Sequence, residues 1–283
     1  MNERGVAVIG GRGRLGSWFV EFFRGHGYDV SSIDVGDQAC PKEVVSRNSI
    51  LIFALPHRIA PSIIKEWGNV VGDDHLVVDL SSVKSRVFEV CVHFSSEVLL
   101  LHPMWSPQVK SMSGQTMICC QEKEGYHRKK AENLISLFQS ADVRLSYLSV
   151  DEHDRIMSFI QVASHGMLVA LGLAYSNSGL SIAKLASAES PVYRMISSMI
   201  GRMLSHQSEL YADIAIENPY GLEALSLVRK AIELVEDLVR AGDNSGYASV
   251  IDSLKASWQG AISLAVEDSS VMIEALAKTR SSS

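Results

Sequence analysis

The chain has 283 residues with a formal net charge of −6, and 47% of its residues are hydrophobic. This length allows two domains with separate cores, and a mildly acidic chain without a basic block argues against nucleic acid or an anionic membrane as a partner. No apolar run reaches the roughly 18 residues of a membrane span, and the first predicted strand starts so close to Met1 that we expect no signal peptide.

The four cysteines show no spacing typical of a metal site. They are Cys40, Cys91, Cys119 and Cys120. Cys119 and Cys120 end an apolar run, which favours buried thiols. We therefore expect no bound metal and a reducing, cytoplasmic environment.

The N-terminal stretch predicts a strand, a glycine-rich turn and a helix. Val6–Gly10 is a short apolar run, as in a parallel strand buried on both faces. Gly11, Gly13 and Gly16 then form a GxGxxG pattern. The first glycine allows a tight turn, the second lets the backbone approach a pyrophosphate, and the third lets the helix pack closely on the strand. An ordinary glycine turn is the competing interpretation, but the flanking strand and helix favour a dinucleotide site.

A second predicted strand, Tyr28–Ile33, ends at Asp34, about 20 residues past the glycine turn. A carboxylate there can accept both ribose hydroxyls of an adenosine and would repel the 2′-phosphate of NADP. Arg12 and Arg14 could contact phosphate or face solvent. The cofactor that we predict is NAD, and its predicted contacts are Gly11, Arg12, Gly13, Arg14, Leu15, Gly16, Asp34, Leu55, Pro56, His57 and Ser81.

Apolar strands and helical patterns keep alternating as far as residue 149. The predicted strands are Ile50–Leu55, Leu76–Leu80, Val98–Leu101, Thr116–Cys120 and Val143–Tyr147, and the predicted helices are Ile59–Trp67, Arg86–Phe94 and Tyr126–Ser140. This alternation predicts an α/β fold with a doubly wound, Rossmann-type parallel sheet over residues 1–149. Ligands of such sheets bind beyond the carboxyl ends of the strands. The polar residues at such ends, which we expect to share one edge of the sheet, are Asp34, His57, Ser82 and His102.

The strand signal stops at Asp151, and residues 150–283 predict an all-helical second domain. Apolar residues recur at spacings of three and four from Ile156 to Leu171, as in a long amphipathic helix. Ser190 and Pro191 are typical of a helix start. Further helices are predicted over Leu222–Ala241 and Ile251–Leu276, separated by the turn Gly242–Gly246. Since an apolar helical domain often packs against a copy of itself, we expect a homodimer.

Several motifs, in the same order, resemble prephenate dehydrogenase, and most closely the dehydrogenase half of the bifunctional chorismate mutase/prephenate dehydrogenase. They are GGRGRLG, VVDLSSVK (Val77–Lys84), LLHPMWSP (Leu100–Pro107), DEHDRIMSFIQ (Asp151–Gln161), SPVYRMISSMIGRM (Ser190–Met203) and LYADI (Leu210–Ile214). The resemblance implies that NAD takes a hydride from the ring carbon bearing the hydroxyl of prephenate, that the ring carboxylate leaves as CO2, and that 4-hydroxyphenylpyruvate forms. The mutase half is not expected, because the first strand begins at once.

The resemblance also assigns catalytic residues. The catalytic histidine of the family maps onto His102, whose imidazole can be neutral at pH 7 and accept the hydroxyl proton. A histidine that only fixes the turn before Pro103 is the competing interpretation. The serine and lysine of the SVK motif map onto Ser82, which can hold the substrate hydroxyl or the imidazole, and onto Lys84, which can meet a carboxylate. Without the resemblance, this motif would be a strand-to-helix turn with a helix cap.

Prephenate is a dianion, so an acidic protein must supply local cations. Arg202 matches the arginine that the family uses for the substrate carboxylate, and Arg194 matches a second arginine that binds substrate or forms a surface ion pair. His165 follows Asp154 by eleven residues and is nearly in phase with it at about 100° per residue. We expect His165 to face the active site, with a satisfied core histidine as the alternative.

Two departures from the family put the substrate in question. Trp105 and Ser106 replace a Phe-Gly pair beside the proposed base, and residues 162–164 differ from the closest relatives. Trp105 and Ser106 are predicted to contact substrate. The alternative to prephenate as substrate is 4-amino-4-deoxyprephenate. A competing interpretation is a β-hydroxyacid dehydrogenase, which has a similar domain arrangement. It would need a catalytic lysine on the first long helix of the second domain, and residues 154–175 contain none. A non-catalytic NAD-binding sensor would have no need of a base.

Overall fold

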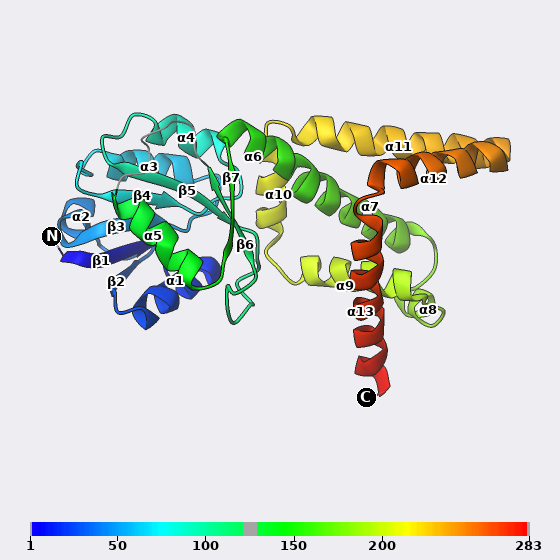
Figure 1. The fold of residues 1–283 in the computed structure, drawn as a ribbon, viewed down its shortest axis with the longest axis horizontal. Helices are drawn as coiled ribbons and strands as arrows, with labels where there is room; N and C mark the ends of the chain where they lie inside the picture. Colours follow the sequence, from blue (N-terminus) through cyan, green and yellow to red (C-terminus); the bar gives the residue numbers. More distant parts are fainter. Residues whose placement is uncertain (1, 121–128, 282–283) are drawn as a thin grey trace. The chain divides into compact units, whose positions relative to one another are not determined.

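The computed structural model describes residues 2–120 and 129–281, and its contacts divide the chain into two compact units (Figure 1). The first unit comprises the chain up to residue 160 together with residues 212–220, and the second comprises residues 161–211 and 221–283. The boundary predicted at residue 149 coincides with the start of helix α6, which lies within the first unit. The chain therefore passes from one unit to the other three times.

The first unit is built on a seven-stranded sheet with the order β2-β1-β3-β4-β5-β6-β7. The strands are β1 (Asn2–Ile9), β2 (Asp29–Ile33), β3 (Asn48–Phe53), β4 (Leu76–Asp79), β5 (Glu97–Pro103), β6 (Thr116–Cys120) and β7 (Arg144–Leu148). The predicted α/β class is confirmed, with one difference: β6 runs antiparallel to β5. Residues 104–115 join these two strands without a helix, and a parallel partner would need a longer crossover connection.

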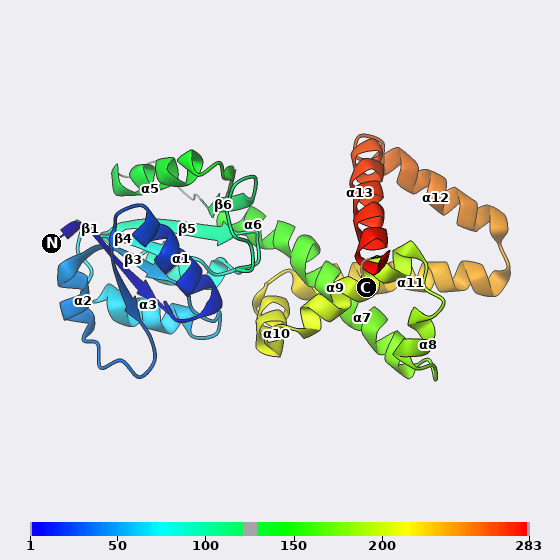
Figure 2. The ribbon, with the colours of Figure 1, turned by 90° about the horizontal axis from the view of Figure 1, so that it is seen from below.

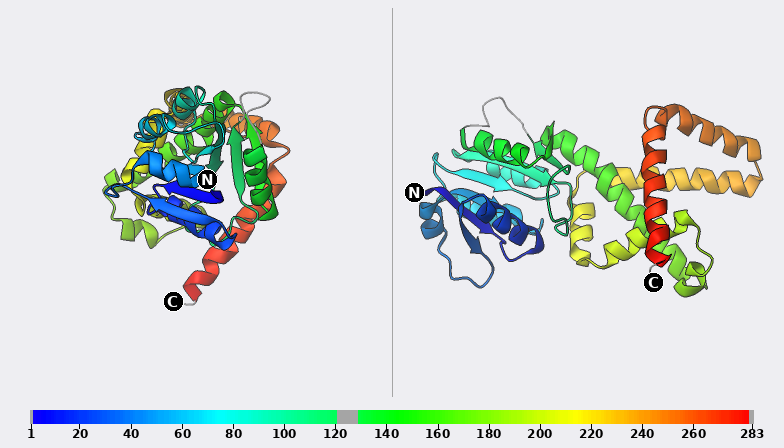
Figure 3. Two further views of the ribbon diagram at one scale, coloured as in Figure 1. Left: turned by 90° about the vertical axis from the view of Figure 1, so that its left-hand side faces the viewer. Right: turned by 60° about the horizontal axis from the view of Figure 1, so that its bottom comes forward.

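Helices cover both faces of the sheet (Figures 1 and 3). On one face lie α1 (Arg14–Gly25) and α5 (Lys129–Ser140), and on the other lie α2 (Pro41–Arg47), α3 (Ala60–Gly68) and α4 (Ser85–Cys91). Successive residues of β1 alternate between the two cores: Val6 and Val8 pack with α1 and α5, whereas Ala7 and Ile9 pack on the opposite side. Helix α2 has no counterpart among the predicted elements, and residues 126–128 of the helix predicted over 126–140 lie outside the described part of the chain.

One helical run, Val150–Asn177, leads from the first unit into the second. It consists of α6 (Val150–Met157), the π-helical segment η1 (Ser158–Ala163) and α7 (Ser164–Asn177). Ser149 and Glu152 form a capping box at its start, which satisfies two backbone N–H groups of the first turn. By length and composition this run could cross a membrane. Within its most apolar stretch of 18 residues, 22% of the residues are buried in the structure. The expectation that no segment meets this criterion was therefore wrong.

The second unit is entirely helical in its described residues. Besides α7 it contains α8 (Ile182–Ala186), α9 (Pro191–Leu204), α11 (Gly221–Ala241), α12 (Asn244–Trp258) and α13 (Ile262–Ser281), and α10 (Ser208–Glu217) passes from it back into the first unit. Ser190 caps α9 as predicted, with its hydroxyl accepting the N–H of Tyr193. The single helix predicted over 251–276 is instead two helices. The helix is interrupted near Gly260, because glycine disfavours a helix interior. Figure 2 shows α12 doubling back beside α11.

Candidate active site

The glycine-rich turn links β1 to α1 with very little space around its backbone. The left-handed residue of the turn is Gly10, with φ of +87°, so the tight turn lies one residue before the glycine to which the sequence pattern assigns it. A Cβ atom on Gly11 would lie 2.3 Å from the hydroxyl oxygen of Ser32, and one on Gly16 would lie 2.0 Å from the carbonyl oxygen of Gly10. Only glycine fits at these positions, so the first turn of α1 packs directly on the loop.

Asp34 follows β2 and lies against this loop. Its Oδ2 accepts the backbone N–H of Arg12 at 2.5 Å, and the Arg12 Nε lies 3.7 Å away. The same guanidinium donates to Asp37 at 3.0 Å, and this hydrogen bond lowers the pKa of Asp37. Of the two predicted loop arginines, Arg12 therefore pairs with two carboxylates, whereas Arg14 is exposed at the start of α1.

Two histidines lie near the carboxyl ends of strands. His57 follows β3, and His102 is the second-last residue of β5. His57 is buried, and its Nδ1 accepts the backbone N–H of Ser82 at 3.3 Å. Burial lowers the pKa of His57. Leu55 and Pro56 lie between the end of β3 and His57. That they line the cofactor stays a prediction.

Lys84 and Ser81 do not have the surroundings predicted for them. Lys84 is fully buried, and its Nζ lies 2.5 Å from Oδ2 of Asp79 and 2.7 Å from the carbonyl oxygen of Leu101. The ammonium therefore neutralises a carboxylate of the chain itself, and the prediction that it binds a substrate carboxylate is corrected. The hydroxyl of Ser81 is likewise turned inward, 2.7 Å from Asp79 Oδ2, which removes it from the predicted cofactor contacts.

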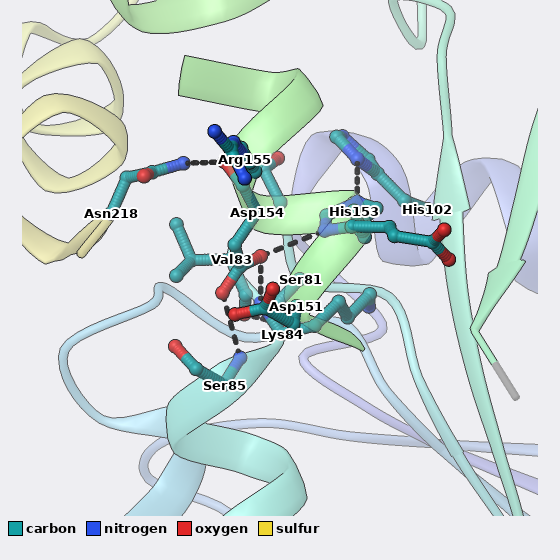
Figure 4. Close-up of polar contacts among 12 residues, drawn as sticks. Ser81, Val83, Lys84, Ser85, His102, Asp151, His153, Asp154, Arg155 and Asn218 are labelled. Carbon is teal, nitrogen blue, oxygen red and sulfur yellow. Dashed lines mark hydrogen bonds and ion pairs between the residues drawn. The ribbon is translucent and has the colours of Figure 1, made fainter. Parts of the chain in front are cut away.

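A row of buried polar side chains connects β5 to α6 (Figure 4). His102 Nδ1 lies 2.9 Å from Nε2 of His153, and His153 Nδ1 lies 2.7 Å from Oδ1 of Asp154. Both His153 and Asp154 are 0% exposed, and His102 is 2% exposed. Burial is the main cause that holds the pKa of His102 well below its ordinary value, and His153, Lys84 and His57 lower it further, in that order. His102 is thus a neutral imidazole at pH 7.

Asp154 is fixed from several sides. Its Oδ1 accepts the backbone N–H of Lys84 and its Oδ2 that of Ser85, each at 2.9 Å, so the carboxylate caps the start of α4. Asn218 donates to the backbone carbonyl of Asp154 at 2.8 Å. Burial alone would raise the pKa of Asp154, but the hydrogen bonds from His153 and from the two backbone N–H groups outweigh it and lower that pKa. The carboxylate is therefore ionised.

Trp105 and Ser106 follow β5 directly. Trp105 is 8% exposed and packs edge-on against Trp18 of α1, with ring centroids 5.9 Å apart. Its Nε1 is buried without a hydrogen-bond partner among the described residues. The prediction that Trp105 contacts substrate is corrected, because its ring is part of the core between the sheet and α1. Ser106 is half-buried, and its carbonyl oxygen accepts the N–H of Val109 in a turn.

The two predicted substrate arginines lie on α9 in the second unit and differ in their surroundings. Arg194 is half-buried, with its Nε 3.6 Å from Glu189 and its guanidinium donating to the Thr279 hydroxyl at 2.9 Å. This side chain holds α9 to α13, so the structural interpretation replaces substrate binding for Arg194. Arg202 is exposed near the end of α9.

His165 lies at the start of α7. Its ring packs edge-on against Tyr211, with centroids 4.9 Å apart, and its Nδ1 is buried without a hydrogen-bond partner among the described residues. Burial lowers the pKa of His165. The predicted phase with Asp154 does not hold, because η1 lies between them and a π-helical segment has more residues per turn than an α-helix.

Three buried residues at this site have no predicted role in the sequence analysis: Asp79, His153 and Asp154. All three lie in the motifs VVDLSSVK and DEHDRIMSFIQ, so the signal was present. A pair of charged or polar residues directly after a capping box, on the helix turn that faces the sheet, could have indicated the contact with His102.

Comparisons with known proteins show relatives of this chain in sequence and in fold. A sequence model of the family "Prephenate dehydrogenase, dimerization domain" matches residues 149–253. The T-protein of Haemophilus influenzae is 27% identical over 259 residues, which cover 90% of this chain and 67% of the T-protein. Prephenate dehydrogenase from Aquifex aeolicus, solved in complex with hydroxyphenyl propionate and NAD+, superposes with a TM-score of 0.72 at 16% identity over 92% of this chain and 99% of its own. Arogenate dehydrogenase from Synechocystis gives a TM-score of 0.67 at 15% identity, over 90% of this chain and 99% of its own.

The fold and the site define a dehydrogenase: a dinucleotide-type sheet with a glycine cradle, a carboxylate after β2, and a buried neutral histidine at the end of β5. More narrowly, residues 149–253 match the dimerization-domain model of prephenate dehydrogenase, and the chain resembles the T-protein of Haemophilus influenzae at 27% identity.

Proposed function

We propose that this protein oxidises prephenate with NAD and releases CO2, giving 4-hydroxyphenylpyruvate. The observation that carries the proposal is His102, a buried neutral imidazole at the carboxyl end of β5 in a chain that resembles prephenate dehydrogenases. Ligands of doubly wound sheets bind at this edge, where a base must meet the substrate hydroxyl.

The residues of the chain have three tasks in this reaction. His102 removes the proton of the ring hydroxyl while hydride leaves the same ring carbon. The bond from the ring to its carboxylate then breaks, and the electron pair of that bond completes the aromatic ring as a phenolate, which takes the proton back from His102. NAD supplies the hydride acceptor. Ser82, whose backbone N–H donates to His57, orients the hydroxyl or the imidazole, and Arg202 binds a carboxylate of the dianionic substrate.

The glycine cradle and Asp34 fit NAD. The loop backbone is free of side chains where a pyrophosphate approaches, since Gly11 and Gly16 have no space for a Cβ atom. Asp34 accepts the backbone N–H of Arg12 in this loop, and a carboxylate beside the loop supports the assignment because it can accept both hydroxyls of a ribose. The Arg12 guanidinium already pairs with Asp34 and Asp37, which leaves this corner with a net negative charge that disfavours the 2′-phosphate of NADP.

The protein acts as a cytoplasmic homodimer in this proposal. The matched family model is a dimerization domain, and helices α11, α12 and α13 expose many large apolar side chains. The same need for a partner surface explains why the run Val150–Asn177 is apolar yet only partly buried. All four cysteines are free thiols, as expected in a reducing compartment.

The test is a side-by-side assay of the purified protein with NAD and three substrates: prephenate, arogenate and 4-amino-4-deoxyprephenate. We expect NADH formation to be fastest with prephenate. Faster turnover of either amino compound would replace the substrate and leave the reaction class intact. The burial of Trp105 removes one of the departures that favoured a ring amine, and Ser106 and residues 162–164 remain. No NADH with any of the three would overturn the proposed function.

A further inference from the structure

The hydrogen bonds around His102 determine which of its nitrogens carries a proton. Asp154 is an ionised carboxylate that accepts from both backbone N–H groups at the start of α4, so its Oδ1 can only accept from Nδ1 of His153. His153 Nδ1 is therefore protonated. Burial lowers the pKa of His153 despite the neighbouring carboxylate, so this ring is neutral and its Nε2 has a lone pair.

The lone pair on His153 Nε2 points at His102 Nδ1, 2.9 Å away, and must accept a proton from it. His102 then carries its proton on Nδ1, and Nε2 is the ring nitrogen that can take up another. The opposite arrangement, with a protonated His153 Nε2 donating to His102, would place the His102 proton on Nε2 and prevent that atom from acting as a base.

We propose that His153 and Asp154 form a positioning relay that fixes the tautomer of His102 and shares the positive charge that His102 acquires during hydride transfer. The proposal rests on the proposed function, because it assigns these two residues a role in the same proton removal. Neither residue touches the substrate in this role, and both act through His102.

The proton balance is simple. The substrate hydroxyl proton moves to His102 Nε2, and the Nδ1 proton of His102 moves toward Nε2 of His153. His153 then becomes an imidazolium paired with the carboxylate of Asp154, whose own hydrogen bond from His153 Nδ1 is unchanged. Lys84 lowers the pKa of both histidines, but only His153 is hydrogen-bonded to a carboxylate, which favours the charge on that ring.

A purely structural role for Asp154, as the cap of α4, is the competing explanation. It predicts lower stability for any variant that loses the carboxylate, with catalysis affected only through misfolding. The relay predicts more: effects that depend on His102 and a change in the pH profile. Variants that keep the shape of the cap separate the two explanations.

Asp154→Asn keeps a side chain of the same shape, and its amide oxygen at the Oδ1 position can still accept from Lys84 N–H and His153 Nδ1–H. The variant therefore keeps the tautomers and removes the negative charge that stabilises a protonated His153. We expect kcat to fall by at least about tenfold, the lower range for partners of a functional histidine. The matched control is Asp151→Asn, which removes a charge from the same helix turn, where Asp151 bonds only the exposed Tyr220 hydroxyl among its described side-chain contacts. This control should leave kcat unchanged.

The His153 variants separate orientation from charge sharing. In His153→Gln the amide oxygen can still accept the Nδ1 proton of His102, so the tautomer is kept while the positive charge can no longer be shared. His153→Leu loses both functions and should be slower than His153→Gln. In a His102→Asn background, which itself lowers kcat by about 10²–10⁴, Asp154→Asn should have no further effect on kcat.

The pH profile gives the second readout. The titratable groups that act on His102 are His153, Lys84 and His57, and together with burial they lower the pKa of His102. Behind them, Asp154 is hydrogen-bonded to His153 and Asp79 is paired with Lys84. Since the base form is active, kcat falls only as pH drops through this lowered pKa. Removing the negative charge of Asp154 lowers the pKa of His102 further, so the acid limb of Asp154→Asn should move to lower pH while its plateau falls.

Nitrogen NMR of the histidine rings tests the relay without turnover. The wild-type protein should show both His102 and His153 protonated on Nδ1. A wild-type Nε2 proton, or an Asp154→Asn effect on kcat that persists in the His102→Asn background, would overturn the relay while the dehydrogenase activity stands. If wild-type protein oxidises none of the three substrates but the tautomers are as expected, the proposed function fails and the relay geometry remains.

Discussion

At the scale of single residues, the two arginines of α9 carry the clearest contrast. Arg194 is half-buried and held by Glu189 and Thr279, whereas Arg202 is exposed. A guanidinium that is already paired has little to offer a ligand, and an exposed one can form two parallel hydrogen bonds with a carboxylate. Of the two arginines that the sequence suggests for the substrate carboxylate, Arg202 is therefore the one that we test.

Arg202→Ala should raise the KM for substrate by more than about tenfold and leave the KM for NAD unchanged. A lost hydrogen bond to a charged group costs roughly 1.5–3 kcal/mol, which corresponds to that range. Initial-rate kinetics with each substrate varied in turn measure both constants. The matched control, Arg194→Ala, should lower the melting temperature through the lost α9–α13 contact. An unchanged substrate KM in Arg202→Ala would place the carboxylate contact elsewhere.

Asp34 sets the cofactor preference. We expect kcat/KM for NAD to exceed that for NADP by more than tenfold, or about 1.4 kcal/mol. Asp34→Ala should narrow this ratio, because the carboxylate that repels a 2′-phosphate is gone and Arg12 loses one of its two partners. Asp37→Ala is the control for the ion pair alone. Equal efficiency of the wild-type protein with both cofactors would contradict the assignment.

At the scale of elements, the contact between α1 and the glycine loop can be tested with one methyl group. Gly16→Ala places a Cβ atom 2.0 Å from the carbonyl oxygen of Gly10, so the helix must shift away from the loop. We expect a loss of roughly 1–3 kcal/mol in stability, as for other overpacked sites, and weaker NAD binding by calorimetry.

The control for this change lies at the other end of the same helix. A Cβ atom on Gly25 meets nothing within 4 Å, and alanine is the better helix former. Gly25→Ala should therefore keep NAD affinity and should not lower the melting temperature. If Gly16→Ala behaves like Gly25→Ala, the close approach of helix and loop is not needed for cofactor binding.

The elements that sequence reasoning predicts well are those with local signals. Buried strands such as β3 and β5 are continuous apolar runs, and Ser190 with Pro191 marks the start of α9 within one residue. The direction of β6 depends on what fills residues 104–115, and the π-helical segment η1 depends on packing, so neither leaves a local pattern. The break near Gly260 was visible as a glycine within an otherwise periodic run.

The site shows the same division. Asp34 and His102 were predictable because the ends of parallel strands meet at one edge of a sheet. The directions of Lys84 and Trp105 were not, because each turns into the interior to meet a partner distant in sequence, Asp79 and Leu101 in one case and Trp18 in the other.

At the scale of the whole molecule, the helices of the second unit predict self-association. Large apolar side chains are exposed along α11, α12 and α13; they include Leu227, Val239, Ile251, Leu254, Trp258, Val266, Val271 and Met272. We call these residues the α11–α13 apolar surface. Monomers rarely expose apolar patches beyond a few hundred Å², so a partner surface is expected here.

We expect sedimentation of twice the chain mass and a melting temperature that rises with protein concentration. Trp258→Glu, at a side chain that is 60% exposed, should shift the protein toward monomer. Val35→Glu, at a side chain of the first unit that is 92% exposed, is the control and should not. A wild-type protein that stays monomeric at micromolar concentration would contradict the homodimer.

Residues 212–220 belong to the first unit although residues 161–211 of the second precede them. Asp213 pairs with Arg58 at 2.9 Å, Glu217 pairs with Arg86, and Asn218 holds the turn of α6 that carries Asp154. In evolutionary terms, the sheet and the helical part are not separable cassettes. A recombination event at residue 149 or 160 would bring in a foreign 212–220 segment, and its acidic residues and asparagine would have to match the resident arginines and the resident helix before the base at His102 could be held in place.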